Sequence, residues 1–431
     1  MLTRINLDTE HDLEGIKKLL GRFKNDTKEQ EAIVASIVED VRLEGDKALF
    51  QYTLRLEGHG LTPENIRVSQ DEISEAYERI DQGLLEALRR SVRRVREFHE
   101  KQKQNSWFDS GKPGELLGQI QRPVSVAGLY APGGKAAYPS SVIMTALPAS
   151  AAGVERIIMA TPAGENGKLP PVTIVAAKES GVHEIYKIGG AQAIAAMAFG
   201  TESVPKADKI AGPGNIYVSL AKGKVYGHAG IDAFAGPSEI LIIADEGASP
   251  VFVAADMLSQ AEHDEMASAM LITTCPALAN QVEKELEKQL ETLTRKEIAS
   301  ESLARSGVIA LVKSLEQAVE LSNQIAPEHL EICTRDPFAL LPLVKNAGAV
   351  FLGHYCPEPL GDYTAGPSHV LPTEGGARFS SPLTVDDFMK KTSVLYFTKE
   401  GMKGIGGDAV MIAEAEGFRA HARSVKVRLE E

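Results

Sequence analysis

A repeated alternation between short apolar segments and longer helical patterns is the feature that most constrains how this chain can fold. Residues 124–130, 157–159, 184–186 and 209–211 read as strands, and a stretch with helical character follows each of them. Strands that alternate with helices in this way lie parallel in one sheet, because each helix carries the chain back to the starting edge. The segment therefore predicts a parallel sheet covered by helices.

The same alternation begins again in the second half of the chain. Strands are predicted at 240–243, 270–272, 307–310 and 349–351, with helical patterns between them. Two units of the same kind predict an α/β protein with two incomplete Rossmann-like parallel-sheet domains of similar topology, flanked by helical N- and C-terminal segments. In such an architecture the ligand is expected in the crevice between the two units.

The charge of the chain excludes several classes of partner. The 431 residues carry a formal net charge of -13 and a pI near 5.4, which disfavours binding to nucleic acid or to an anionic membrane. No apolar run has the length of a membrane span, and the first residues lack the pattern of a signal peptide. Three cysteines without a C-x-x-C pair argue against a disulfide framework. We expect a cytoplasmic protein that acts on a small molecule.

One carboxylate and one imidazole stand side by side directly after a proline, as Pro327-Glu328-His329. Proline disfavours helix at the residue before it, so the pair is expected on a rigid extended turn. Glutamate and histidine are the side chains most readily tuned for proton transfer near neutral pH. The alternative is that the two side chains are simply solvated on a surface loop.

A possible metal site is suggested by Gln260 and His263, which are three residues apart on a predicted helix at 250–266. This spacing places them on one helix face, where an amide oxygen and an imidazole nitrogen are plausible ligands for zinc. The alternative is a histidine at the surface, hydrogen-bonded to the amide.

Two further groups of polar residues occur late in the chain. Asp362 and His369 lie in a Gly/Pro-rich segment, which suits a functional loop, although an Asx turn at Asp362 is an equal alternative. Glu416 and His421 are five apart, a spacing that does not share a helix face unless Gly417 breaks the helix between them. Otherwise the tail is an ordinary amphipathic terminal helix.

Glycine-rich turns follow several predicted strands, at 130–134, 189–192, 212–215 and 235–238. Glycine lets the backbone approach a ligand closely, and a helix N-terminus attracts phosphate. The chain contains no G-x-G-x-x-G motif, so a dinucleotide would bind without the usual fingerprint. Taken singly, each turn is also explained as purely structural.

Together these segments resemble the histidinol dehydrogenase family, because its motifs occur here in order along nearly the whole chain. Single motifs are weak, but the full set in register is highly specific. The matching motifs are 128–134 (GLYAPGG), 190–194 (GAQAI), 211–215 (AGPGN), 235–239 (AGPSE), 260–263 (QAEH), 326–330 (APEHL), 361–363 (GDY), 369–373 (HVLPT) and 416–421 (EGFRAH).

The resemblance implies roles for individual residues. Zinc is expected to be held by two imidazoles, a carboxylate and an amide oxygen, from Gln260, His263, Asp362 and His421. The same four residues, together with Ser238, His329, His369 and Glu416, are expected to contact the substrate. NAD+ is expected to contact Tyr130, Gln192 and Asn215, which lie on the glycine-rich turns.

The resemblance also implies the reaction. L-histidinol is oxidised through L-histidinaldehyde to L-histidine, with two NAD+ reduced in sequence, as the final steps of histidine biosynthesis. The first oxidation requires a base for the alcohol proton, and the second requires a base that activates water; His329 suits the first role and Glu328 the second.

Domain boundaries and assembly follow from the same resemblance. We expect a helical segment at 1–22, an NAD-binding Rossmann-like domain at 130–238, and a discontinuous substrate and metal domain at 23–129 and 239–381. Residues 382–431 are expected to form a helical arm for dimerisation. This arm would carry Glu416 and His421 into the site of the partner in a homodimer.

Three other functions remain compatible with these residues. A zinc hydrolase would use Glu328 as a base on metal-bound water and would turn over without NAD+. A non-catalytic metal-binding or nucleotide-binding protein would bind ligand without turnover. A relative within the family would oxidise a different amino alcohol or a sulfonate diol.

Overall fold

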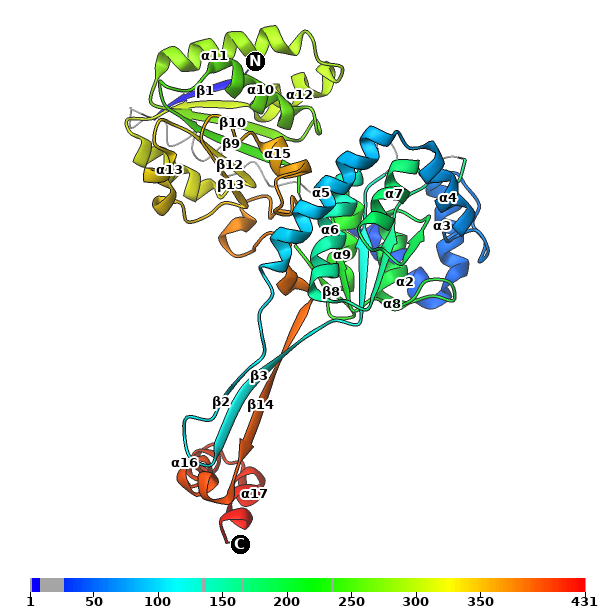
Figure 1. Ribbon diagram of the computed structural model, residues 1–431, viewed down its shortest axis with the longest axis vertical. Helices are drawn as coiled ribbons and strands as arrows, with labels where there is room; N and C mark the ends of the chain where they lie inside the picture. The colour runs from blue at the N-terminus through cyan, green and yellow to red at the C-terminus, as the bar shows by residue number, and fades with distance from the viewer. Residues whose placement is uncertain (1, 8–26, 134–136, 165, 234–235, 431) are drawn as a thin grey trace.

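The computed structural model describes residues 2–7, 27–133, 137–164, 166–233 and 236–430. It contains two α/β units and an arm that extends away from both (Figure 1). One unit is built on a five-stranded sheet and the other on a six-stranded sheet; we call them the five-stranded unit and the six-stranded unit. The predicted fold class, two parallel-sheet units with helical terminal parts, is confirmed.

The five-stranded sheet has the order β6-β5-β4-β7-β8, and all of its strand pairs are parallel. Its strands are β4 (Val126–Tyr130), β5 (Arg156–Ala160), β6 (Glu184–Tyr186), β7 (Lys209–Ala211) and β8 (Gly230–Ile231). Between them run α6 (Pro139–Ala152), α7 (Pro171–Glu179), α8 (Gly190–Phe199) and α9 (Ile216–Val225). These bounds agree closely with the strands and helices predicted from the alternation.

The strand order reverses at β4, which lies between β5 and β7, so the carboxyl ends of β4 and β7 mark the switch point where doubly wound sheets bind ligands. Gly212, directly after β7, lets the chain pass close to the end of β4 at this switch point. Its φ is +126°, and a Cβ there would lie 2.1 Å from the carbonyl oxygen of Tyr130 at the end of β4. Only glycine adopts this positive φ readily and also has no Cβ to clash with the Tyr130 carbonyl.

The six-stranded sheet repeats this topology and adds one strand. Its order is β1-β11-β10-β9-β12-β13, again with parallel pairs. The strands are β1 (Thr3–Asn6), β9 (Glu239–Ala244), β10 (Ser268–Thr273), β11 (Val308–Leu311), β12 (His329–Cys333) and β13 (Ala349–Leu352). The helices are α10 (Pro250–Ala261), α11 (Pro276–Leu290), α12 (Lys296–Ser306), α13 (Leu315–Ile325), α14 (Pro337–Leu340) and α15 (Glu358–Tyr363).

A short linker connects the carboxyl end of β8 directly to the amino end of β9. The buried Lys222 ammonium holds its start by pairing with Asp232 and donating to the carbonyl oxygens of Gly212 (3.1 Å) and Ala233 (2.9 Å). Gly236, later in the linker, donates its N–H to the Thr373 hydroxyl at 2.6 Å. The linker is therefore fixed at both ends, and it leads from the ligand-binding edge of one sheet to the amino edge of the other.

The arm contains two strands, β2 (Trp107–Asp109) and β14 (Met389–Phe397), that the sequence analysis did not predict. Both pair antiparallel with β3 (Glu115–Pro123), where a strand at 118–120 was predicted. Beyond this ribbon lie α16 (Lys399–Ala415) and α17 (Arg419–Glu430) at the far end of the arm (Figure 1). The C-terminal part is helical as predicted beyond β14, but β14 was missed because its partner strand β3 lies far earlier in the sequence, with Met389 paired to Pro123 and Phe397 to Glu115.

The packing of the N-terminal region differs from the expected domain grouping. Residues Thr3–Asn6 form β1 beside β11 where a helical segment was expected, and 8–22 lie outside the described residues. Four helices, expected within 23–129 to join the six-stranded unit, pack their apolar faces on the five-stranded unit. These helices are α2 (Lys28–Glu44), α3 (Asp46–Glu57), α4 (Gln70–Arg79) and α5 (Gln82–Glu100).

Candidate active site

Glu328 and His329 lie at the amino edge of the six-stranded sheet and are buried, with only 6% and 4% of their surface exposed. Helix α13 ends at Ile325, and the left-handed φ of +53° at the next residue, Ala326, turns the chain through Pro327. His329 is then the first residue of β12, so it stands at a strand end and not on a turn. The alternative of a solvated surface pair is wrong.

The backbone of one residue orients both side chains. The Glu239 N–H donates to Oε2 of Glu328 at 2.9 Å, and the Glu239 carbonyl oxygen lies 2.9 Å from Nδ1 of His329. A carbonyl oxygen can only accept, so Nδ1 carries the proton and the neutral ring presents a lone pair at Nε2. Nε2 is buried and has no hydrogen-bond partner among the described residues.

Burial pushes both side chains toward their neutral forms. It raises the pKa of Glu328 well above the usual range, opposed by the Glu239 N–H and reinforced by nearby carboxylates. It lowers the pKa of His329, although the charge of Asp362 and the Glu239 carbonyl oppose that shift. Perturbed pairs of this kind are typical of groups that exchange protons.

Two carboxylates and a second imidazole border Nε2 of His329. Oε1 of Glu358 lies 3.7 Å away and Oδ1 of Asp362 lies 4.0 Å away, while Nδ1 of His369 is 3.5 Å from the same Asp362 oxygen. Burial opposes ionisation of Asp362, but the His369 and His329 rings hold its pKa at about 2. Asp362 lies in the short helix α15, which replaces the expected loop. The Glu331 side chain anchors this helix by accepting the Glu358 N–H at 2.7 Å.

Of the predicted metal ligands, His263 interacts electrostatically with Asp362, and Gln260 follows Ser259, whose hydroxyl donates to Oε2 of Glu358 at 3.5 Å. Gln260 is fully buried at the end of α10, and neither its Oε1 nor its Nε2 has a partner in the described part of the chain. Leaving both polar atoms of a buried amide unpaired is costly, so this side chain fits a ligand role. His263 lies just past the helix, which ends at Ala261 and not at 266; partial desolvation lowers its pKa, and the Asp362 charge opposes this.

The cluster offers two overlapping sets of metal ligands. Ligand atoms of His329, Glu358 and Asp362 all lie within 4.8 Å of one another, while the set expected from the family resemblance is Gln260, His263, Asp362 and His421. Imidazole, carboxylate and amide oxygen are all suitable for zinc, so the residues present fit the metal in either set. Asp362 belongs to both.

His421 and Glu416 are not brought to this cluster within one chain. Both are exposed on the arm, which extends away from the two sheets (Figure 1). Helix α16 ends at Ala415, Gly417 has φ +82°, and α17 begins at Arg419, so the predicted break between the two residues is present. Ser238, by contrast, directly precedes Glu239 at the cluster and is half-buried.

The three residues predicted to contact NAD+ gather at the carboxyl edge of the five-stranded sheet. Tyr130 ends β4, and its hydroxyl accepts the Gly190 N–H at 3.1 Å at the start of α8, where Gln192 lies. Asn215 caps α9, with its Oδ1 accepting from two backbone N–H groups. All three border the switch point between β4 and β7 or the adjacent helix start.

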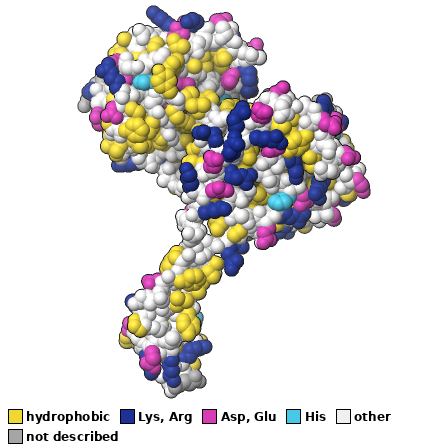
Figure 2. All heavy atoms as spheres, in the orientation of Figure 1, with side chains coloured by type: hydrophobic (Ala, Val, Ile, Leu, Met, Phe, Trp, Pro, Cys, Tyr) yellow, Lys and Arg dark blue, Asp and Glu magenta, His cyan; other side chains and the backbone are white. Residues whose placement is uncertain are grey.

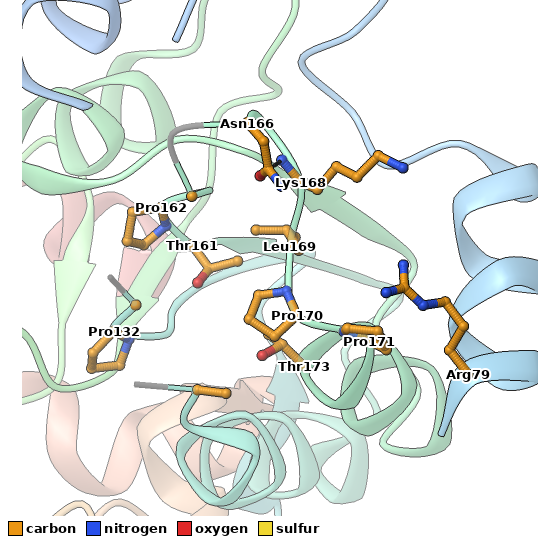
Figure 3. A pocket seen from close by; sticks show the side chains of 13 residues that line it. Arg79, Pro132, Thr161, Pro162, Asn166, Lys168, Leu169, Pro170, Pro171 and Thr173 are labelled. Atoms are coloured by element: carbon orange, nitrogen blue, oxygen red, sulfur yellow. Dashed lines mark hydrogen bonds between the residues drawn. The ribbon is translucent and has the colours of Figure 1, made fainter. Parts of the chain in front are cut away.

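A pocket of about 290 Å³ opens next to these residues, in the loops after β4 and β5 (Figure 3). Prolines, among them Pro132, Pro162 and Pro170, form much of its wall, and Arg79 and Lys168 stand at its side. Pro162 lies against Gly189, where a Cβ would be 2.6 Å from its ring, so the pocket adjoins the start of α8. Sequence reasoning missed Arg79 and Lys168, which no motif contains.

Comparison with known proteins agrees with this architecture. The family model for histidinol dehydrogenase matches residues 20–429. The chain belongs to the histidinol dehydrogenase family. It is 54% identical over 428 residues to the histidinol dehydrogenase of Caldanaerobacter subterraneus subsp. tengcongensis, covering 99% of each chain. It is 51% identical over 425 residues to that of Geobacter metallireducens, covering 98% of this chain and 97% of the relative.

A solved structure shows the same fold over the whole length. The crystal structure of histidinol dehydrogenase from Elizabethkingia anophelis superposes with a TM-score of 0.93 at 39% sequence identity, covering 100% of this chain and 98% of the other. The arrangement of the two units and the arm is therefore that of the family.

Measuring bound zinc in single variants distinguishes the two ligand sets. With Gln260, His263 and Asp362 as ligands, Gln260→Ala and Asp362→Asn should each lose most of the zinc after dialysis. His329→Asn and Glu358→Gln should retain it. Zinc per subunit is measured by inductively coupled plasma mass spectrometry. His228→Asn, which changes an exposed histidine of the five-stranded unit, is the control. Loss of zinc in His329→Asn with retention in Gln260→Ala would assign the metal to the other set.

Proposed function

We propose that this protein oxidises L-histidinol through L-histidinaldehyde to L-histidine, using bound zinc and two NAD+ per substrate, as the final steps of histidine biosynthesis. Membership of the histidinol dehydrogenase family supports the reaction. The observation that carries the mechanism is the buried Glu328-His329 pair, oriented by Glu239 and bordered by Asp362.

Gln260, His263 and Asp362, with His421 of a second subunit, would hold the zinc. When bound, zinc would orient the substrate through its imidazole and amino nitrogens. Ser238, His369 and Glu416 would contact the same substrate. His329 also lies beside this position, since its Nε2 is 4.0 Å from Oδ1 of Asp362.

His329 is the base for the first oxidation. The Glu239 carbonyl fixes the proton on Nδ1, so Nε2 accepts the proton of the substrate hydroxyl. Burial keeps the ring neutral before the reaction, which is the form that can accept this proton. The bond that breaks is the substrate O–H bond, and the proton moves to Nε2.

Glu328 is the base for the second oxidation. It removes a proton from the water that adds to the aldehyde carbon. Its buried position makes the ionised carboxylate a stronger base than an exposed glutamate, and the Glu239 N–H holds one of its oxygens in place. The enclosed position of the pair also limits the escape of the reactive aldehyde between the two steps.

The five-stranded unit is the proposed NAD+ domain. NAD+ bound there would accept the hydride in each oxidation. The switch point between β4 and β7 supports this position, as do Tyr130, Gln192 and Asn215 around it. The adjoining pocket, at about 290 Å³, is near the lower end of the roughly 300–1,000 Å³ typical of ligand sites, so it suits one end of a dinucleotide.

The arm is the proposed dimerisation element. Its exposed side chains include Leu395, Ile412 and Phe418, at 67%, 61% and 54% exposure, and Figure 2 shows hydrophobic side chains along it. Exposed apolar surface of this kind is typical of a protein interface. A second subunit would cover this surface and receive Glu416 and His421. In the described part of the chain, no helix combines the length and apolar character needed to cross a membrane.

The two bases should be separable by half-reactions. Glu328→Gln should slow oxidation of supplied L-histidinaldehyde by roughly 10²–10⁴-fold, because a general base is lost, and slow histidinol-to-aldehyde turnover far less. His329→Asn should impair the first half as well. Both halves are followed by NADH absorbance in single turnovers, with the exposed Glu246→Gln as the control. Equal losses in both halves for Glu328→Gln would contradict this division of roles.

Sharing of the site between subunits should appear as complementation. His329→Ala and His421→Ala homodimers should each be nearly inactive, whereas heterodimers formed by mixing, unfolding and refolding should regain activity at one site in two. The activity of the mixture is compared with that of each variant refolded alone. If the mixture stays as inactive as its parents while heterodimers are detected by mass spectrometry, each site belongs to one chain.

A further inference from the structure

Glu57 ends helix α3 and reaches the first turn of α8, although the two are more than 130 residues apart in sequence. Its Oε1 accepts the Gly189 N–H at 2.9 Å and the Gln192 side-chain Nε2–H at 3.0 Å. No motif flags this glutamate, and it has no role in the reaction described above. Its contacts nevertheless fix one of the predicted NAD+ residues.

Gln192 is almost completely buried, with 1% of its surface exposed. The Nε2 group of Gln192 donates to Glu57. The Oε1 atom of Gln192 has no hydrogen-bond partner among the described residues. Burying an acceptor without a donor is costly, so this oxygen is suited to a donor from a ligand. It lies beside Gly190, where a Cβ would be 2.8 Å away, so the absence of a side chain leaves that space free.

The neighbouring Tyr130 offers the complementary group. Its hydroxyl oxygen accepts the Gly190 N–H at 3.1 Å, which leaves the phenol proton available to donate. Burial raises the pKa of Tyr130 to about 12, so this proton is retained at neutral pH. Gly190 thus has a donor on one side and an unpaired acceptor on the other.

Two of the N–H groups at the start of α8 are not free to bind a phosphate. Helix N-termini bind anions through their first free N–H groups. Here the Gly189 N–H is taken by Glu57 and the Gly190 N–H by Tyr130. A ligand group beside Gly190 meets one donor, the Tyr130 hydroxyl, and one acceptor, the Gln192 oxygen, which suits a carboxamide or a ribose hydroxyl.

We propose that Glu57 is a positioning residue that holds the Gln192 carboxamide with its oxygen toward the dinucleotide, where it accepts a hydrogen bond from a carboxamide or ribose hydroxyl and not from a phosphate group. This inference rests on the proposed use of NAD+. Glu57 itself does not touch the dinucleotide; it acts through Gln192.

Two substitutions at Glu57 distinguish the effect of its acceptor oxygen from the effect of its charge. Glu57→Met removes the acceptor and releases the Gln192 amide, so NAD+ binding should weaken about tenfold, the value of one ordinary hydrogen bond. Glu57→Gln retains an oxygen for both donors and should bind NAD+ within about twofold of wild type. Binding is measured by calorimetry on the intact dimer. The exposed Glu44→Met is the control.

A double-mutant cycle distinguishes positioning from a structural role. Gln192→Leu should weaken NAD+ binding about as much as Glu57→Met, and the double variant should be no worse than either, because both remove one contact. The KM for histidinol should stay near its wild-type value. If Glu57 acted only by stabilising the start of α8, the two losses would add. Gln192→Leu beside native Glu57 also keeps the test decisive if Glu57→Met does not fold.

The identity of the donor follows from the ligand used. If the donor is the nicotinamide carboxamide, Glu57→Met weakens NAD+ but not ADP-ribose; if it is a ribose hydroxyl, both weaken. If the wild-type protein binds NAD+ and Glu57→Met binds it equally well, or if the losses in the cycle add, the positioning role of Glu57 is wrong. The proposed use of NAD+ would still stand. Failure of the wild-type dimer to bind NAD+ at all would overturn the proposed cofactor, and this inference with it.

Discussion

The backbone of Glu239 is the point on which the rest of the site depends. Its N–H donates a hydrogen bond to Glu328, and its carbonyl oxygen accepts one from His329. The backbone of this one residue, at the start of β9, therefore orients both side chains and sets the tautomer of the imidazole. This arrangement exists because β9 and β12 pair in parallel, with His329 opposite Ile240. A shift of that register by one residue would turn His329 to the other face of the sheet.

Glu239 also stands at the end of the linker between the two units. Because β9 begins where the linker ends, the amino edge of the six-stranded sheet is tied to the carboxyl edge of the five-stranded sheet, where ligands of doubly wound folds bind. The buried Lys222-Asp232 pair fixes the first part of that connection. The proposed proton-transfer groups and the proposed dinucleotide site therefore lie at opposite edges of two similar sheets.

Much of the fold could be predicted because it depends on local pattern. The strand and helix alternation from residue 124 onward reflects apolar spacing within short windows, and nearly every predicted element is present. The pairing of β14 with β3, the packing of α2 to α5 and the position of β1 were missed or misplaced, since each depends on contacts between distant segments. Local pattern carries no information about such contacts.

The candidate site shows the same limit. Glu328, His329, Gln260 and Asp362 stand in recognisable motifs, whereas Glu57 contributes through a contact that only the folded chain creates. Glu358 was missed because a loop was expected around Asp362; in helix α15 it precedes Asp362 by four residues and shares its helix face. The position of the pair at strand amino ends was not expected either, because the usual rule places ligands at carboxyl ends.

We propose that one enclosed site performs both oxidations without releasing the aldehyde. The most direct measurement is the number of NADH formed per L-histidinol consumed by the zinc-loaded dimer, with the organic product identified by mass spectrometry. We expect two NADH and L-histidine, with no free L-histidinaldehyde trapped by an added amine reagent. One NADH per substrate with accumulated aldehyde, or turnover without NAD+, would contradict it.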